Sequence, residues 1–363
     1  MWTVLRRLDL RTVPILLMLM GISLTVISSM TAGDGPLITR EMMSQFQFFC
    51  LGIVVYCIAA SMDYRKIRDY TWVLYGLTLL LLLGLFLTPT INGCHRWYRL
   101  PLLPFAIQPS EIAKLVVVIV LAKLIDERAP FWVMAGAVFL PFALIYKQPD
   151  LGSALILFPM TLAMFYFGEV SRRVIRIMGF SALFALSIVV MIFLGVIDHE
   201  KVRPYVKGVL KEYQYERLNP KTYHQTAAQT AIALGGISGS GYHKSEYSSH
   251  KWLPYAHTDS VFPAYAEEFG LIGSYLLIGL YFGLIYCSFQ VVAVAKDPYG
   301  RALAAGLSVY LAVHVIVNMG MMCGLLPITG VPLLLVTSGG SSVLSSMAGL
   351  GALQSVYTRR FMF

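Results

Sequence analysis

The chain has 363 residues, of which 57% are hydrophobic and only 13% charged, and its formal net charge is +9. This balance excludes a water-soluble domain with a polar surface and indicates a polytopic membrane protein. The positive charge does not predict a nucleic-acid partner, because the basic residues lie in short loops between apolar stretches and not on one amphipathic element.

Ten apolar stretches follow one another along the sequence, and transmembrane helices need roughly 17 to 25 apolar residues. The expected spans are residues 13–30, 46–62, 71–88, 112–125, 131–146, 151–167, 174–197, 269–292, 303–323 and 338–356. The sequence therefore predicts an all-α polytopic membrane protein with about ten transmembrane helices. We expect residues 1–363 to form a single membrane domain.

Basic residues set the expected orientation, because short cytoplasmic loops attract Lys and Arg. An even number of spans puts both termini on one side, and the short loops on that side carry most of the basic residues. This predicts cytoplasmic N and C termini. Residues 198–257 then form one long extracytoplasmic loop, which we expect to be a partly ordered cap because it lacks a clear periodicity.

The segment 257–270 brings acidic residues to the outer end of a span. Because Pro263 is tolerated only in the first turn of a helix, Thr258, Asp259 or Ser260 should lie at or beside the N-cap. The Asp259 carboxylate would then lie at the outer mouth of the span. Ionisable groups at such places are costly and are functional candidates, although helix capping is the alternative for Asp259.

Other charged residues also lie at the ends of spans. Glu111 and Lys114 are three residues apart and can pair on one helix face, so an ordinary intrahelical salt bridge is the alternative to a functional role. Arg96 can bind a phosphate in a bidentate manner, but with Trp97 it also fits a belt of interfacial residues. Asp150, in a tight turn, is predicted to be a structural N-cap.

Residues 325–342 are rich in Pro and Gly at membrane depth. Irregular backbone is tolerated there only when it is buried in protein or lines a cavity. We therefore expect a re-entrant segment in which Gly339, Gly340 and Ser341 present backbone amides to an anion. Close packing of helices through small residues is the alternative.

Eight motifs, taken together and in order, resemble the SEDS family, the RodA and FtsW proteins of bacterial cell-wall synthesis, and RodA more than FtsW. They are GCHRWYRL, IQPSEIAKL, KQPDLGSALIL, RLNP, AIALGGISGSGY, LPYAHTDSVFPAYAEEFGLIGS, NMGMMCGLLPITGVPL and SGGSSVL. The resemblance covers nearly the whole chain. One departure is Tyr255, at a position where the family usually has Glu.

The resemblance implies a multi-pass protein of the bacterial plasma (inner) membrane that polymerises lipid II into glycan strands for cell shape or division. It implies a class B penicillin-binding protein as the transpeptidase partner. The family's essential aspartate falls on Asp259, which we expect to be the general base. Substrate-binding residues are expected at Arg96, Trp97, Glu111, Lys114, Arg217, His257, Thr258, Gly339, Gly340 and Ser341.

The chemistry agrees with these residue types. A sugar hydroxyl that attacks the lipid-linked donor must lose a proton, which a carboxylate can accept. The departing pyrophosphate needs a countercharge, from basic residues or from a divalent cation such as Mg or Mn, and the sequence does not identify metal ligands. Two alternatives stay open, namely a lipid II flippase and a non-catalytic scaffold that activates a penicillin-binding protein.

Overall fold

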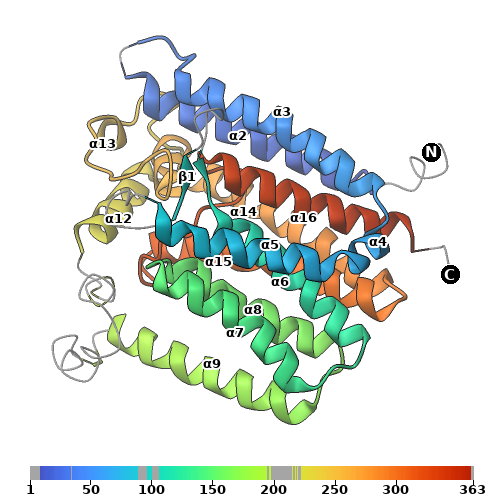
Figure 1. The fold of residues 1–363 in the computed structure, drawn as a ribbon. Helices are drawn as coiled ribbons and strands as arrows, with labels where there is room; N and C mark the ends of the chain where they lie inside the picture. The colour runs from blue at the N-terminus through green and yellow to red at the C-terminus, as the bar shows by residue number, and fades with distance from the viewer. Residues whose placement is uncertain are drawn as a thin grey trace.

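The computed structural model describes residues 9–33, 35–88, 96–99, 106–193, 196–197, 215, 217, 219 and 222–360. They form a bundle of helices with one small antiparallel ribbon, in which β1 (Tyr98–Arg99) pairs with β2 (Ala106–Ile107) (Figure 1). The helices are α2 (Thr12–Ala32), α3 (Arg40–Ser61), α4 (Tyr64–Asp69), α5 (Thr71–Gly84), η1 (Leu85–Leu87), α6 (Pro109–Asp126), α7 (Phe131–Lys147), α8 (Leu151–Phe167), α9 (Arg172–Phe193), α12 (Tyr223–Gly235), α13 (Glu246–Ser249), α14 (Val261–Val294), α15 (Pro298–Met322) and α16 (Gly340–Thr358).

Each of the ten apolar stretches coincides with a helix of this bundle over most of its length. Among the described helices, α2, α3, α9, α14 and α15 are long and apolar enough to cross a membrane by length and composition. Three others, α5 with η1, α7 and α8, are apolar but shorter. The expectation of a helical protein with several apolar helices is confirmed, whereas the number of spans stays a prediction.

Side chains at the helix starts explain several boundaries. Thr39 accepts a hydrogen bond from the Met42 amide at 3.2 Å before α3, and Asp297 accepts one from the Gly300 amide at 2.8 Å before α15. Such N-caps satisfy amides that have no partner inside the helix. Both α6 and α15 also begin with proline, whose fixed φ suits the first helical turn. The starts of these helices are therefore determined by residues that are close in the sequence.

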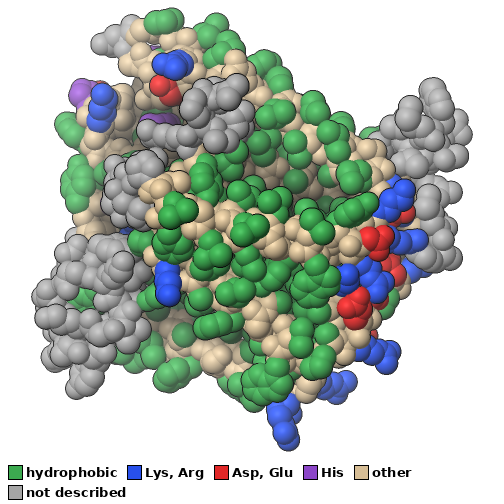
Figure 2. Space-filling model, in the orientation of Figure 1, with side chains coloured by type: hydrophobic (Ala, Val, Ile, Leu, Met, Phe, Trp, Pro, Cys, Tyr) green, Lys and Arg blue, Asp and Glu red, His purple; other side chains and the backbone are tan. Residues whose placement is uncertain are grey.

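Helix α15 lies at the centre of the bundle, and α9 lies at its periphery. Of the most apolar window of each helix, 72% is buried in α15 but only 6% in α9. Helix α9 packs against α8 and exposes large apolar side chains such as Phe180 and Phe184. Figure 2 shows apolar side chains across the middle of one face and charged side chains gathered at one end. An exposed apolar surface of this extent is typical of contact with lipid.

Both chain ends lie at one end of the bundle, and α12 and α13 lie at the other (Figure 1). The Tyr64 amide at the start of α4 donates to Ser355 Oγ of α16 at 3.3 Å, and Arg359 pairs with Asp63 at 3.8 Å. Asp9, just before α2, lies within electrostatic range of Arg360. This agrees with an even number of passes through the bundle.

The described part of the expected loop 198–257 is attached to α14 at a kink. Gly270 has φ 63° and ψ −160° within α14, and the freed amide of Leu271 donates to the Gly236 carbonyl at 3.0 Å. A Cβ on Gly270 would collide with the backbone nitrogen of Gly239, so only glycine fits at this crossing. The segment after α12 and helix α14 are thus joined through their backbones.

The chain between α15 and α16 is irregular, and its second half, from residue 331 to 337, is mostly buried. Val331, Leu334 and Val336 are at most 2% exposed. Ser23 of α2 donates to the Val336 carbonyl at 2.9 Å, and Tyr281 of α14 donates to the Leu334 carbonyl at 2.6 Å. Irregular backbone is therefore enclosed by protein here, as expected from the sequence.

Candidate active site

The turn before α14 is fixed by hydrogen bonds to three consecutive backbone carbonyls. The Ser338 amide donates to the His257 carbonyl at 3.1 Å and the Thr337 hydroxyl donates to the Thr258 carbonyl at 3.3 Å. On α15, the Asn318 side-chain amide donates to the next carbonyl at 3.1 Å. That carbonyl belongs to Asp259, whose backbone is therefore held by the irregular segment and by α15.

Asp259 is half-buried, and its carboxylate accepts no hydrogen bond from any residue that the structure describes. Helix α14 begins at Val261 with Ser260 as N-cap, and no side chain caps it. Asp259 thus lies beside the N-cap, as predicted, without serving as a cap. Burial raises the pKa of Asp259, although Arg217 and Arg96 act to lower it. The carboxylate is left available for an external proton donor.

Two arginines from different outer segments flank this carboxylate. A guanidinium nitrogen of Arg96 donates to the Pro149 carbonyl, and Arg217 Nη1 donates to the Thr329 carbonyl at 3.2 Å. Both lie close enough to Asp259 to lower its pKa. Trp97, next to Arg96, is half-buried at the start of the ribbon. The structure therefore brings two of the expected cations to the aspartate.

A histidine of α12 also reaches this turn. His224 Nε2 lies 2.7 Å from Ser260 Oγ, and burial and nearby Arg217 lower the pKa of His224. Burial also lowers the pKa of His257, against the opposing effect of Glu41. Both imidazoles are therefore mainly neutral near pH 7. Sequence reasoning missed His224, because no local pattern signals a contact between α12 and the start of α14.

A second carboxylate lies nearby but is already engaged. Asp150 caps α8 by accepting from the Ser153 amide at 3.3 Å, as predicted. It also accepts from Gln108 Nε2 at 3.1 Å and Ser110 Oγ at 3.0 Å. With these three donors Asp150 is a structural residue, and its negative charge contributes to raising the pKa of Asp259.

The small residues before and in the first turn of α16 make protein contacts. The Gly339 amide donates to Gln45 Oε1 at 3.2 Å. A Cβ on Gly340 would come 2.7 Å from the Phe48 ring, so this glycine allows close packing of α3 and α16. Ser341 Oγ donates to the Ala106 carbonyl at 2.9 Å. This arrangement fastens the ribbon and α3 to the start of α16.

Within α6, Glu111 and Lys114 form a buried ion pair of 2.7 Å. Lys114 Nζ also lies 2.8 Å from His314 Nε2, and His314 Nδ1 lies 2.7 Å from the Tyr310 carbonyl. Because an ammonium group only donates, these contacts define a neutral imidazole with its proton on Nδ1. The predicted pair is therefore part of a network, in which no described hydrogen bond reaches Asp259.

The two glutamates that follow in α14 bind the outer loop. Glu267 accepts from the backbone amides of Tyr247 and Ser248 at 2.9 and 3.0 Å. Glu268 accepts from the His243 amide at 3.1 Å and from the Ser29 hydroxyl. They therefore hold the loop that contains α13 against α2 and α14.

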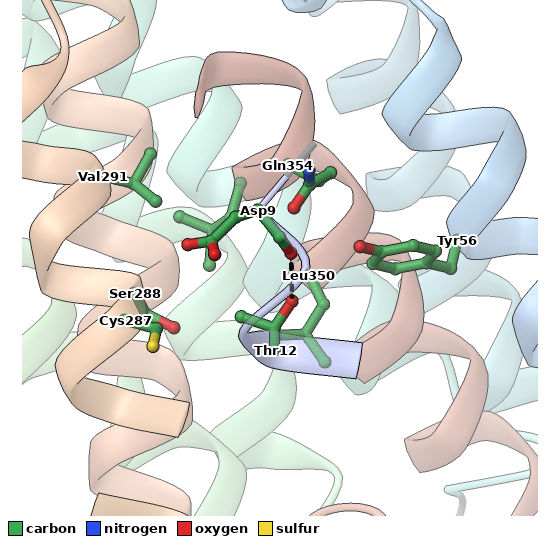
Figure 3. A pocket seen from close by; sticks show the side chains of 9 residues that line it. Asp9, Thr12, Tyr56, Cys287, Ser288, Val291, Leu350 and Gln354 are labelled. Carbon is green, nitrogen blue, oxygen red and sulfur yellow. Dashed lines mark hydrogen bonds between the residues drawn. The ribbon is translucent and has the colours of Figure 1, made fainter. Parts of the chain in front are cut away.

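One small cavity lies at the opposite end of α14 (Figure 3). It has a volume of about 10 Å³, and its lining includes Asp9, Tyr56 and Gln354. This is room for no more than one water molecule. In the described part of the chain, no cluster of three or more His, Cys, Asp or Glu side chains could hold a metal ion.

The fold and this site define an α-helical, multi-pass membrane protein with a carboxylate at one end of the bundle that lies within electrostatic range of two arginines. The chain belongs to the FtsW/RodA/SpoVE family, because the family model described as "Cell cycle protein" matches residues 6–361. This confirms the resemblance seen in the motifs.

Several proteins of similar sequence or structure are named for peptidoglycan synthesis. Peptidoglycan glycosyltransferase MrdB of Escherichia coli (strain K12) is 33% identical over 362 residues, which cover 98% of this chain and 95% of the relative. Peptidoglycan glycosyltransferase RodA of Treponema pallidum (strain Nichols) is 29% identical, with 93% and 94% covered. A chain solved in "Structural coordination of polymerization and crosslinking by a peptidoglycan synthase complex" is 27% identical, with TM-score 0.77 and 98% and 99% covered.

Proposed function

We infer that this chain is a peptidoglycan glycosyltransferase. Family membership and full-length similarity to proteins named for that activity support this conclusion. We further propose that it polymerises lipid II, the lipid-linked disaccharide donor of peptidoglycan. The observation that carries the catalytic assignment is the Asp259 carboxylate, which has a fixed backbone and accepts no hydrogen bond from the described residues.

In the proposed reaction Asp259 is the general base. The 4-hydroxyl oxygen of the acceptor sugar attacks the anomeric carbon of the donor, and Asp259 takes the hydroxyl proton. The bond between the anomeric carbon and the pyrophosphate oxygen breaks, and the lipid pyrophosphate leaves with the electron pair. A positioned base of this kind contributes about 10²–10⁴-fold to the rate. A raised pKa brings Asp259 nearer the operating pH, which suits a base.

The leaving pyrophosphate needs positive charge near the site. Arg96 and Arg217, which flank Asp259, are the proposed source, since arginine binds phosphate through paired donors. A divalent cation, Mg or Mn, is a second source, because Mg²⁺ is commonly held by one or two carboxylates and the substrate's phosphates. Asp259, which accepts no hydrogen bond from the described residues, is the carboxylate proposed to bind such a cation, and Asp150 lies near it.

The other expected binding residues are proposed in two groups. Trp97, His257 and Thr258 lie in the outer segments around Asp259 and are proposed to contact the donor. We propose that five residues act from the protein interior by holding the site in shape. These are Glu111, Lys114, Gly339, Gly340 and Ser341.

We propose that the Asp259 end of the bundle faces outward from a bacterial inner membrane, with ten spans in a single domain and both termini in the cytoplasm. Residues 198–257 form the outer loop. A cysteine at exposed Ser249, in a background without native cysteines, should react with a membrane-impermeant maleimide in intact spheroplasts. A cysteine at Glu127, in the α6–α7 turn, should react only after lysis, and the reverse pattern would refute this orientation.

The proposed partner is a class B penicillin-binding protein that cross-links the strands. The similarity to a chain of a peptidoglycan synthase complex supports this proposal. We expect the purified chain to co-elute with such a transpeptidase.

The decisive experiment measures polymerisation of labelled lipid II by the native chain and by Asp259→Asn, with and without the transpeptidase. Asparagine keeps the volume but cannot accept the proton, so glycan ladders should disappear while partner binding persists. Asp69→Asn, an exposed carboxylate in α4, is the matched control. Native ladders that persist in Asp259→Asn would refute the base. Movement of lipid II across vesicles without ladders would indicate a flippase, and stimulation of the transpeptidase alone would indicate a scaffold.

A further inference from the structure

A tyrosine four residues before Asp259 has an unusual backbone conformation. Tyr255 has φ 56°, in the left-handed region that side-chain-bearing residues rarely adopt. Its carbonyl accepts from the Thr258 amide at 3.0 Å and the Ser260 amide at 3.1 Å, which closes the turn that carries Asp259. Strained backbone of this kind concentrates at functional sites. Because the same residue closes the turn that carries Asp259, the direction of the Tyr255 side chain depends on the geometry of that turn.

The Tyr255 ring is exposed but supported from one side. Its side chain is 63% exposed, and its ring centroid lies 5.9 Å from that of His224. His224 is in turn held by Ser260, at 2.7 Å. An apolar ring that is fixed at its back and open to solvent at its front is a surface for a ligand and not part of a core.

Two more exposed aromatic rings continue this surface across the outer loop. The Tyr223 hydroxyl donates to the Trp252 carbonyl at 2.9 Å, and these side chains are 64% and 52% exposed. Trp252 is positioned by the His250 ring, with centroids 5.3 Å apart. We call Tyr223, Trp252 and Tyr255 the outer aromatic surface. They belong to the start of α12 and the turns before α14, outside the apolar helices, which argues against a role as interfacial anchors of a span.

The chemistry of the surface fits a sugar. Pyranose rings present flat faces of C–H groups, which pack on aromatic faces, and hydroxyl and amide groups at the ring edge, which bind polar groups such as a tyrosine hydroxyl. Tyr223 precedes His224, whose ring lies against Tyr255, and Trp252 lies three residues before Tyr255, so the three aromatic residues come from neighbouring parts of the fold. The glycan strand is the saccharide that extends away from Asp259 in the proposed reaction.

We propose that the outer aromatic surface is a glycan-binding subsite, in which Tyr255 stacks against a sugar ring of the growing strand next to the reactive end. This inference rests on the proposed function. Such a contact retains the strand between additions and so sets strand length, while the coupling step itself depends on Asp259.

The first test measures binding without catalysis. In the Asp259→Asn background, saturation-transfer NMR with soluble oligomers of N-acetylglucosamine should show ring protons in contact with the protein. Tyr255→Ala should weaken this binding about three- to tenfold, the range expected for one aromatic stack, while Tyr255→Trp should preserve it. Trp132→Ala, which removes an 80% exposed ring at the opposite end, is the control. Equal binding by Tyr255→Ala and its parent would overturn the proposal.

The second test measures strand length with labelled lipid II. At equal consumption of lipid II, Tyr255→Ala should release shorter strands than the native chain does, and Tyr255→Trp should restore their length. Unchanged strand length would also overturn the proposal. Loss of transpeptidase binding by Tyr255→Ala, with oligosaccharide binding intact, would identify the surface as a protein-docking site instead. Absence of ladders from the native chain, with oligosaccharide binding that depends on Tyr255, would refute the polymerase and leave the subsite standing.

Discussion

The Asn318 side-chain amide donates a 3.1 Å hydrogen bond to the backbone carbonyl of Asp259. It also donates to the Val331 carbonyl at 2.8 Å. One fully buried side chain of α15 therefore joins the reactive turn to the irregular segment before α16.

Replacing Asn318 with Leu should disturb this junction. The two carbonyls lose a donor, which costs about 1–3 kcal/mol for each group left unsatisfied. Displacement of Asp259 by even 1 Å should lower kcat about 100-fold. Thermal unfolding and lipid II turnover in the same detergent would measure both effects. Ser23→Ala, which removes the hydrogen bond to the Val336 carbonyl and the one accepted from Gln45, should leave turnover near the native value. Equal losses in the two variants would contradict this account.

The pH dependence should report on Arg217. A general base works when ionised, so activity is lost as pH falls through the raised pKa of Asp259. Because Arg217 lowers that pKa, Arg217→Gln should raise it further and move the acidic limb of kcat/KM to higher pH. Arg176→Gln, in α9, is the control for loss of a positive charge. If the acidic limb of kcat/KM stays at the same pH in Arg217→Gln, Arg217 does not affect the pKa of the base.

Lys114 should be needed mainly for stability. Lys114→Met leaves Glu111 buried without its cation, which should cost about 3–5 kcal/mol of unfolding free energy. Adding Glu111→Gln should recover a large part of that loss, because the unpaired charge is removed. The two single variants and the double variant form a double-mutant cycle. Measurements of their unfolding free energies give the coupling energy of the pair. Additive losses would show that the pair is not coupled.

Alanine substitutions at two neighbouring glycines, Gly236 and Gly239, should differ sharply in their effect on stability. A Cβ at Gly239 would collide with the Glu268 carbonyl, and its φ is 81°. A Cβ at Gly236 would meet no atom within 4 Å, although its φ is 53°. Gly236→Ala should therefore cost only about 1 kcal/mol of backbone strain, whereas Gly239→Ala should detach the loop from α14. Limited proteolysis near α13 should detect detachment in Gly239→Ala alone.

Much of the helical layout could be predicted from the sequence, because apolar runs and caps are local signals. Asp150 at the N-cap of α8 and the Glu111–Lys114 pair within one helix both follow from short spacings. The start of α14 also follows from a local signal, because Pro263 predicts Thr258, Asp259 or Ser260 at or beside the N-cap, and Ser260 is the N-cap. The contacts of Glu267 and Glu268 with the segment around α13 could not be predicted, because they join parts of the chain that are distant in sequence.

The contacts between distant segments could not be predicted. His314 binds Lys114 and Asn318 binds the Asp259 carbonyl across helices, and one sequence does not reveal which helix faces which. His224 and Gln45 were missed for the same reason. Asp259 could be singled out from its position before Pro263, whereas the groups that hold it could not.

The three carbonyl contacts of the reactive turn have a consequence for biosynthesis. A ribosome makes Asp259 before Asn318, Thr337 and Ser338, the residues that fix its turn. A nascent chain that stops after α14 therefore carries Asp259 without the groups that hold its backbone. With Asp259 as the proposed general base, catalysis should require insertion of α15 and of the segment leading into α16, and a prematurely terminated protein should be inert even though its aspartate is intact.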